Sequence, residues 1–295
     1  MLPNFKQRLA LALTSVIAGV VLIQLAGGLR PADGSDGLVL FDARIGPVLA
    51  VLGLAGLVAV VAALALPAAA MGNRLGGVFV VAAGLALFGI NTGPADGWYH
   101  RAALPTGFWM LAVETLVYLA LWIGVLALLR WATAPVAHRL PRWLRSAMPA
   151  HETTFALPGG QAWIGGGVAA VIGGVVSALL LRSTDVGQVT GALILGFTIG
   201  GVVARASAPQ ATPVVILLSP LATAIAAYGY LATQYLTADA VLAAKYTGQI
   251  LGLGLALPIH YAAAGVVGTA IGVGMGQGLE HNYHETARQT DQPAR

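Results

Sequence analysis

Glu114 is the residue of this sequence best placed to do chemistry, because it is the one carboxylate inside a long apolar run, residues 106–129. Ionisable groups at that depth usually face the interior of a helix bundle or a water-filled path. Tyr118 and Trp122 follow at spacings of four and eight, so a helix would place all three on one face. The pattern fits one wall of a proton, cation or solute pathway. It also fits a structural carboxyl that is hydrogen-bonded to neighbouring helices.

His260 is the second candidate, with Pro258 just before it and Tyr261 just after it. If the last apolar stretch enters the membrane near Gln249, His260 lies about 17 Å along the helix, close to the midplane. Pro258 removes one backbone donor and predicts a helix break, and unwound backbone beside a polar side chain is one way transporters form a site. The alternative is a neutral histidine with one interhelical hydrogen bond beside a plain kink.

Several classes of chemistry lack their residues in this sequence. The absence of cysteine excludes disulfides, thiolate nucleophiles and cysteine-ligated metals. There is no GxxxxGK[ST], no GxSxG and no second acid beside Glu114 within an apolar run. His281 and His284 match no zinc motif. We therefore predict no enzyme activity, no metal, no cofactor and no binding of nucleic acid.

Composition places these residues in a membrane. The chain is 58% hydrophobic and 9% charged, whereas soluble domains carry about 25% charged residues. Apolar runs of 18 or more residues favour helices over a barrel. The predicted fold is an all-α, polytopic membrane helix bundle with eight transmembrane helices, at 9–29, 45–70, 75–91, 106–129, 161–181, 188–204, 214–236 and 246–279. We interpret 9–29 as an uncleaved span rather than a signal peptide.

The eight runs divide the chain into four regions: helices 1–4 within 1–130, a basic linker at 131–160, helices 5–8 within 161–279, and a polar tail at 280–295, expected to be disordered. As one straight helix, the last stretch, Tyr246–Leu279, would be about 50 Å long, against a hydrocarbon core of about 30 Å. It must therefore tilt, project or break, and a break is expected near Pro258. A parallel four-plus-four repeat remains open, although the halves show no sequence match.

Charge predicts the orientation. With eight spans, ten of the 15 lysines and arginines lie on the side of the N-terminus and five on the other. The positive-inside rule then places both termini in the cytoplasm, in a plasma (inner) membrane. Tryptophans should mark the interfaces, with Trp98 and Trp109 outside and Trp131, Trp143 and Trp163 inside.

Small residues at a spacing of four predict close helix packing, within the chain or between subunits. The positions are Gly196, Gly200, Gly248, Gly252, Gly268, Gly272 and Gly276. A large side chain at Gly268 should therefore do more damage than one at Gly37, in a predicted loop. A second surface feature is basic and amphipathic, and predicts an in-plane helix on the inner leaflet or, alternatively, an irregular loop. It comprises Arg139, Arg142, Trp143 and Arg145.

Two functions follow from these residues. The first is a non-catalytic structural or assembly subunit of a membrane complex, which contacts the lipid bilayer and forms a homo- or hetero-oligomer through Gly-rich helix faces. The alternative is a small-solute or ion permease that uses Glu114, Tyr118, His260 and Tyr261. A cavity shared by Glu114 and His260 would favour the permease.

Overall fold

The structure is a computed structural model that describes residues 5–31, 36–71, 74–101, 107–139 and 159–290. The described residues form helices joined by short connections and contain no strand, only one isolated bridge between Pro31 and Ala43. The predicted all-α class is confirmed. Arg142, Trp143 and Arg145 of the predicted in-plane helix lie outside the described residues, and Arg139 is the exposed last residue of its helix.

Within the part of the chain that the structure describes, seven helices are long and apolar enough to cross a membrane. They are α2 (Pro47–Met71), α3 (Arg74–Asn91), α5 (Gly107–Arg139), α6 (Gly160–Leu180), α7 (Val186–Ser207), α8 (Pro213–Gln234) and a last span, Pro258–Gly278, that runs into α11 (Val266–Thr290). Helix α1 (Phe5–Leu25) adds a shorter apolar part, Leu9–Leu25. The structure is thus a multi-pass membrane bundle, and the eighth crossing stays a prediction.

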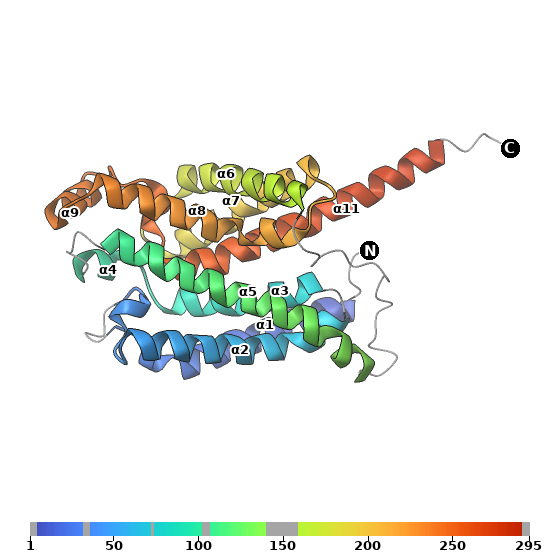
Figure 1. Cartoon of the computed structure of the whole chain (residues 1–295), viewed down its shortest axis with the longest axis horizontal. Coiled ribbons are helices and arrows are strands. Elements are labelled where there is room, and N and C mark those ends of the chain that lie inside the picture. Colours follow the sequence, from blue (N-terminus) through green and yellow to red (C-terminus); the bar gives the residue numbers. More distant parts are fainter. Residues whose placement is uncertain (1–4, 32–35, 72–73, 102–106, 140–158, 291–295) are drawn as a thin grey trace.

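The long helices run side by side along the long axis of the molecule (Figure 1). One half holds α1, α2, α3 and α5, and the other holds α6, α7, α8 and α11. The fourth helix of each half packs against the third helix of the other, α5 on α8 and α11 on α3. A short helix precedes the fourth helix in both halves, α4 (Asp96–Arg101) and α9 (Ala238–Tyr246), and these two meet at one end of the bundle, called here the α4–α9 end. The same order of elements therefore occurs twice, as a parallel repeat would have it.

The last apolar stretch is not one helix. Helix α9 ends at Tyr246, Gly248 has a positive φ of 69°, and a 3-10 turn, η4, covers Gly252–Leu255. The final span begins with α10 (Pro258–His260), continues through a π-helix, η5 (Tyr261–Gly265), and becomes α11. A helix entering near Gln249 was therefore the wrong expectation. Proline has no N–H and a helical φ, so it suits the first position of a helix and sets the start here.

This start corrects the depth of His260, which is the third residue of the span rather than a midplane residue. The tail also differs from expectation, because α11 stays helical to Thr290 and extends beyond the other helices (Figure 1).

Glycines let α7 pack closely against two neighbours. A Cβ at Gly268 or Gly272 of α11 would collide with the carbonyls of Ile194 and Thr198 on α7. The other face of α7 packs through Gly196 and Gly200 against α6, and Gly276 of α11 faces Arg205 of α7. The Gly248–Gly252 pair is different, since neither residue lies in an α-helix; Gly248 has open space around it and Gly252 packs on Ala178 and Leu181. The sequence left open whether these glycines pack helices within the chain or between subunits. The helix contacts described here form within the chain.

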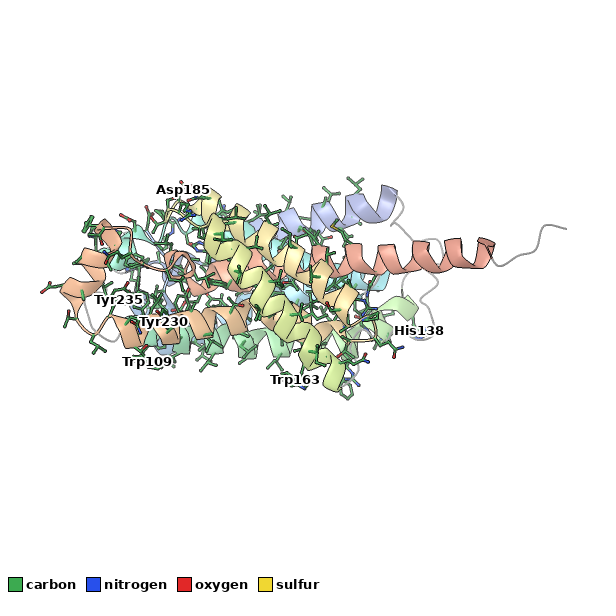
Figure 2. All side chains as sticks on the ribbon, turned by 90° about the horizontal axis from the view of Figure 1, so that it is seen from above. Trp109, His138, Trp163, Asp185, Tyr230 and Tyr235 are labelled. Atoms are coloured by element: carbon green, nitrogen blue, oxygen red, sulfur yellow. The ribbon has the colours of Figure 1, made fainter. Side chains whose placement is uncertain are left out.

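The tryptophans are only partly interfacial. Trp109 is 52% exposed and lies toward the α4–α9 end, and Trp163 is 65% exposed and lies toward the opposite end (Figure 2). Trp131 is exposed as well. Trp98, expected at the interface, is instead 2% exposed and packs against Tyr99 and Phe108. An apolar ring near a helix end is buried here because α4 folds back over the bundle.

Candidate functional site

The central feature at the α4–α9 end is a piece of irregular backbone, residues 250–257, called here the inserted segment. It passes inside the bundle between α9 and Pro258, and Ala256 and Leu257 are fully buried. Non-helical backbone within a membrane protein needs partners from the protein, because no lipid group can satisfy its N–H and C=O groups. Backbone groups of the inserted segment that form no hydrogen bond within the segment therefore need partners from neighbouring elements.

Three tyrosines supply those bonds, each from a different element. Tyr99 of α4 donates its hydroxyl to the Gly254 carbonyl, Tyr228 of α8 donates to Ala256, and Tyr261 of η5 donates to Leu253, each at 2.7 Å. All three side chains are at most 1% exposed. The sequence suggested only Tyr261 as a pathway residue; the structure shows the three tyrosines as supports of the inserted segment.

The inserted segment can lie this close to the helices because it contains glycine. A Cβ at Gly254 would come within 2.5 Å of Leu231 of α8, and one at Gly252 within 2.7 Å of the Ala178 carbonyl of α6. Gly252 was a predicted packing position, whereas Gly254 was not among them. Both glycines let the backbone of the inserted segment approach neighbouring side chains and backbone at van der Waals distance.

Trp122 carries out a similar task one layer deeper. Its indole Nε1–H donates to the Ala262 carbonyl at 2.8 Å, within the π-helix. A π-helix shifts the hydrogen-bonding register of the helix and is frequent at functional sites. Here Trp122 satisfies a carbonyl of η5, so the deep tryptophan predicted from sequence holds the start of the last span.

Glu114 is fully buried and is held by a loop from far away in the sequence. Its Oε2 accepts a hydrogen bond from the Leu40 backbone N–H at 2.9 Å. Leu40 belongs to residues 36–43, called here the inner loop, which was expected to be an exposed polar connection. Instead Leu38, Val39 and Leu40 are at most 1% exposed. Their apolar side chains explain the burial, because they can enter the bundle and their charged neighbours remain at its edge.

Two polar atoms beside this contact have no hydrogen-bond partner, the Oε1 of Glu114 and the hydroxyl of Tyr118 one helical turn later. Tyr118 is 1% exposed. Buried polar groups nearly always have a partner, so such a pair is an unusual feature of a folded protein. The predicted common face of Glu114 and Tyr118 is consistent with this arrangement.

His260 lies apart from this pair. Its Nδ1 accepts from the Leu257 N–H at 3.1 Å, so the neutral ring carries its proton on Nε2. Nε2 is directed toward Gly89 of α3 without forming a hydrogen bond. The imidazole therefore caps the backbone where the inserted segment becomes helix. In the described part of the chain, no hydrogen bond links His260 to Glu114.

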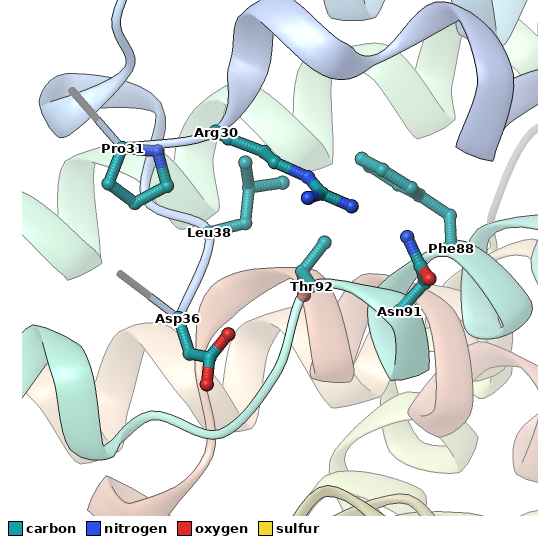
Figure 3. A pocket seen from close by; sticks show the side chains of 7 residues that line it. All are labelled: Arg30, Pro31, Asp36, Leu38, Phe88, Asn91 and Thr92. Atoms are coloured by element: carbon teal, nitrogen blue, oxygen red, sulfur yellow. The ribbon is translucent and has the colours of Figure 1, made fainter. Parts of the chain in front are cut away.

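A small cavity opens beside the inner loop and encloses about 50 Å³. Figure 3 shows its lining, which consists of Arg30, Pro31, Asp36, Leu38, Phe88, Asn91 and Thr92. Glu114 and His260 are not part of it. It is therefore not the cavity shared by Glu114 and His260 that would have favoured a permease.

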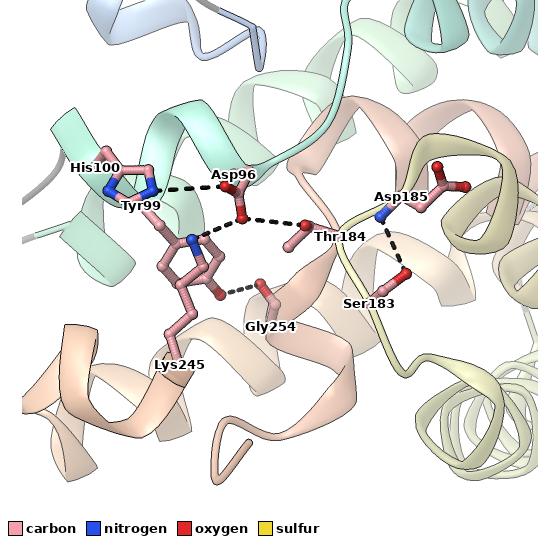
Figure 4. Close-up of polar contacts among 8 residues, drawn as sticks. All are labelled: Asp96, Tyr99, His100, Ser183, Thr184, Asp185, Lys245 and Gly254. Atoms are coloured by element: carbon pink, nitrogen blue, oxygen red, sulfur yellow. Dashed lines mark hydrogen bonds and ion pairs between the residues drawn. The ribbon is translucent and has the colours of Figure 1, made fainter. Parts of the chain in front are cut away.

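A polar cluster closes the α4–α9 end and links the two halves (Figure 4). Lys245 of α9 lies 2.7 Å from Asp96 of α4, and Thr184 of the α6–α7 connection donates to the same carboxylate at 3.3 Å. His100 approaches its other oxygen at 3.5 Å, and the Lys245 ammonium lies 5.3 Å from the Tyr99 ring centre. The hydrogen bond from Lys245 lowers the pKa of Asp96, while burial raises the pKa of Tyr99.

The sequence did not indicate this cluster; within α4 it predicted only that Trp98 marks the interface. Lys245 and Asp96 belong to different halves, and no local pattern links them. Among the residues that the structure describes, no group of three or more histidines and carboxylates is arranged to hold a metal ion.

Comparison with protein-family models, with curated proteins and with solved structures finds no match for this chain. The function is therefore argued from the arrangement of its own residues.

Proposed function

We propose that this protein is a non-catalytic, multi-pass subunit of a membrane complex, which crosses a plasma (inner) membrane eight times with both termini in the cytoplasm. The observation that carries the proposal is how the interior polar groups are used. Tyr99, Tyr228, Tyr261 and Trp122 all donate to backbone carbonyls. Side chains committed in this way maintain a shape and are not available to bind or convert a substrate.

The size of the cavity supports the same conclusion. Ligand pockets usually have volumes of about 300–1,000 Å³ and collect several converging polar groups. The cavity beside the inner loop, at about 50 Å³, has room for water rather than for a metabolite. Within the described residues, the interior thus favours a packed subunit over an enzyme.

The partner contact is proposed at the end of α11. This helix continues to Thr290, past the ends of the other helices (Figure 1). A helix end that projects past the bundle is suited to contact a partner at the membrane surface. Because the glycine seams are used within the chain, they add no separate argument for oligomer formation.

A truncation tests this subunit function. The full chain and a chain ending at Leu279 would be extracted from native membranes in mild detergent and weighed by native mass spectrometry. We expect a stoichiometric complex for the full chain, a single-chain mass for the truncated one, and equal thermal stability. A single-chain mass for both, in detergent and in lipid nanodiscs, would contradict the proposal.

The proposal of eight crossings depends on counting α1 as a span, and the orientation depends on the distribution of basic residues. Helix α1 begins and α11 ends at the same end of the bundle, as an even number of crossings requires (Figure 1). The ten-to-five division of basic residues then favours cytoplasmic termini. A reporter that is active only in the cytoplasm should be active when it is fused after Arg295. If only a reporter that works outside the cytoplasm is active there, this orientation is excluded.

A permease is the second candidate, and one observation favours it. Glu114 and Tyr118 keep unpartnered polar atoms near an inserted, non-helical segment, and transporters build sites from such elements. Flux of a panel of ions and solutes into proteoliposomes tests this candidate. Uptake by the native protein that is lost in a folded Glu114→Gln variant would support a permease. No flux above that of empty vesicles would favour the subunit function.

A further inference from the structure

We propose that Glu114 is a proton-binding site and that the inner loop, residues 36–43, is the lid that separates it from water at the α4–α9 end. This inference does not depend on the subunit function. It starts from a buried carboxyl that the support of the inserted segment leaves unused. One oxygen of Glu114 accepts from Leu40, and the other has no partner although the side chain is fully buried.

The groups around Glu114 do not provide a positive charge. On α5 itself the titratable side chains are Tyr118 and, more than four turns from Glu114, Arg130, His138 and Arg139. The elements packed against α5 add Asp42 of η2, Tyr228 and the exposed Tyr230 of α8, His260 of α10 and Tyr261 of η5. Helix α2 contains no charged residue, and Arg74 of α3 lies at the opposite end. His260 is neutral, because its Nδ1 accepts a hydrogen bond. Asp42 opposes a second negative charge.

A carboxylate in this position therefore needs a cation. The desolvation penalty of an unpaired buried carboxylate exceeds what one backbone hydrogen bond returns. A metal ion would need several oxygen ligands and space between them. The described cavity does not reach Glu114. A proton needs neither several oxygen ligands nor additional space, so it is the cation that this site can hold. It is carried on Oε1 while Oε2 accepts from the Leu40 N–H.

A small pocket lies beside the part of the inner loop that contacts Glu114. The cavity of about 50 Å³ includes Leu38 in its lining, two residues before the Leu40 that contacts Glu114 (Figure 3). This volume can hold water, and its lining includes Arg30, Asp36, Asn91 and Thr92. In this proposal, the inner loop separates water in the pocket from the carboxyl.

Displacement of the inner loop breaks at least two hydrogen bonds. Gly37 donates its N–H to the Thr92 carbonyl at 2.9 Å, and Leu40 donates to Glu114. With the proton on Oε1, the neutral carboxyl stays packed under Leu40. When the proton passes to water in the pocket, the carboxylate requires hydration, which displacement of the lid provides. Loss of the proton therefore opens the lid, and its return closes it.

The first test uses the unmodified full chain and the apolar reagent dicyclohexylcarbodiimide, which attacks protonated carboxyls. Peptide mass spectrometry should find the adduct on Glu114, formed more slowly as the pH rises, by about tenfold per pH unit above the titration midpoint. Glu114→Gln should lack that adduct. No adduct on Glu114 at any pH, or an adduct rate that does not depend on pH, would overturn the proposal.

The second test follows the lid and uses the natural absence of cysteine. Leu38→Cys, 1% exposed in its native form, would be labelled with a membrane-impermeant maleimide. Leu236→Cys, at a 68% exposed position at the same end, corrects for ionisation of the thiol. We expect labelling at position 38 to increase with pH more than at position 236, and Glu114→Gln to remove this excess. Equal pH dependence at both positions, or an excess that persists in Glu114→Gln, would refute the lid.

Discussion

Removing one tyrosine hydroxyl tests whether the inserted segment depends on side chains for its shape. Tyr228 is fully buried, and its hydroxyl donates to the Ala256 carbonyl at 2.7 Å. Tyr228→Phe keeps the ring and leaves this carbonyl without its donor, in a region that water does not reach. A buried acceptor left unsatisfied costs about 1–3 kcal/mol, so we expect the free energy of unfolding to fall by that amount.

Thermal unfolding in detergent measures the effect. For chains of 150–250 residues, 1 kcal/mol corresponds to about 2–4 °C in Tm, so Tyr228→Phe should lower Tm by several degrees. Tyr230→Phe is the matched control, because Tyr230 lies on the same helix and is 56% exposed. It undergoes the same chemical change without a buried partner and should leave Tm nearly unchanged.

Equal Tm for the two variants would refute the reasoning, because the inserted segment would then not need the hydroxyl. A double variant adds a second criterion. The rings of Tyr228 and Tyr261 lie 6.1 Å apart and support neighbouring parts of the same segment. Their two Phe substitutions should therefore be non-additive in Tm, as is typical of residues that share one structural unit.

Three further substitutions test the helix seam, the inner loop and the polar cluster. Gly268→Ala should destabilise by about 1–3 kcal/mol, because its Cβ would meet the α7 backbone, whereas Gly191→Ala, with open space around it, should be neutral or stabilising in the same Tm assay. Gly37→Ala should cost more than about 1 kcal/mol in chemical unfolding, since φ is +89° and the Pro94 carbonyl lies 2.9 Å from the added Cβ; an unchanged midpoint would contradict this. Lys245→Met should destabilise by about 0.2–1 kcal/mol at neutral pH, because Asp96 is 47% exposed. The lowered pKa of Asp96 makes this contribution complete above the unperturbed value of 3.8 and lost as the pH falls through the lower folded value, so a Tm difference that survives strong acid would contradict the pairing.

The all-α membrane class could be predicted from sequence because it depends on a property of single segments. A run of apolar residues long enough to cross the hydrocarbon core must satisfy its own backbone, and a helix does so locally. The bounds of α2, α3, α5, α6, α7 and α8 agree with the predicted runs within a few residues at most ends, although α5 continues past its run to Arg139. The burial of Glu114 followed from the same argument, since it is an acid within such a run.

The inserted segment could not be predicted in this way. Residues 250–257 are as apolar as a helix, and their irregular backbone is stable only because Tyr99 and Tyr228, distant in sequence, donate to it. The local signals, Gly248, the glycine-rich turn and Pro258 at a helix start, indicated a break without indicating what would replace the helix.

The environment of Gly37 is a second feature that the sequence did not predict. The sequence placed it in a loop where a large side chain should do less damage than at Gly268, whereas the fold gives it a positive φ and packs it against Pro94, Leu257 and Trp98. The sequence determined by itself which segments are long and apolar enough to cross a membrane and that one carboxyl lies within such a segment, because both follow from the transfer of side chains and backbone into an apolar phase. Only the tertiary structure decided which groups meet Glu114 and the inserted segment, because those contacts join helices of both halves and no local spacing encodes them.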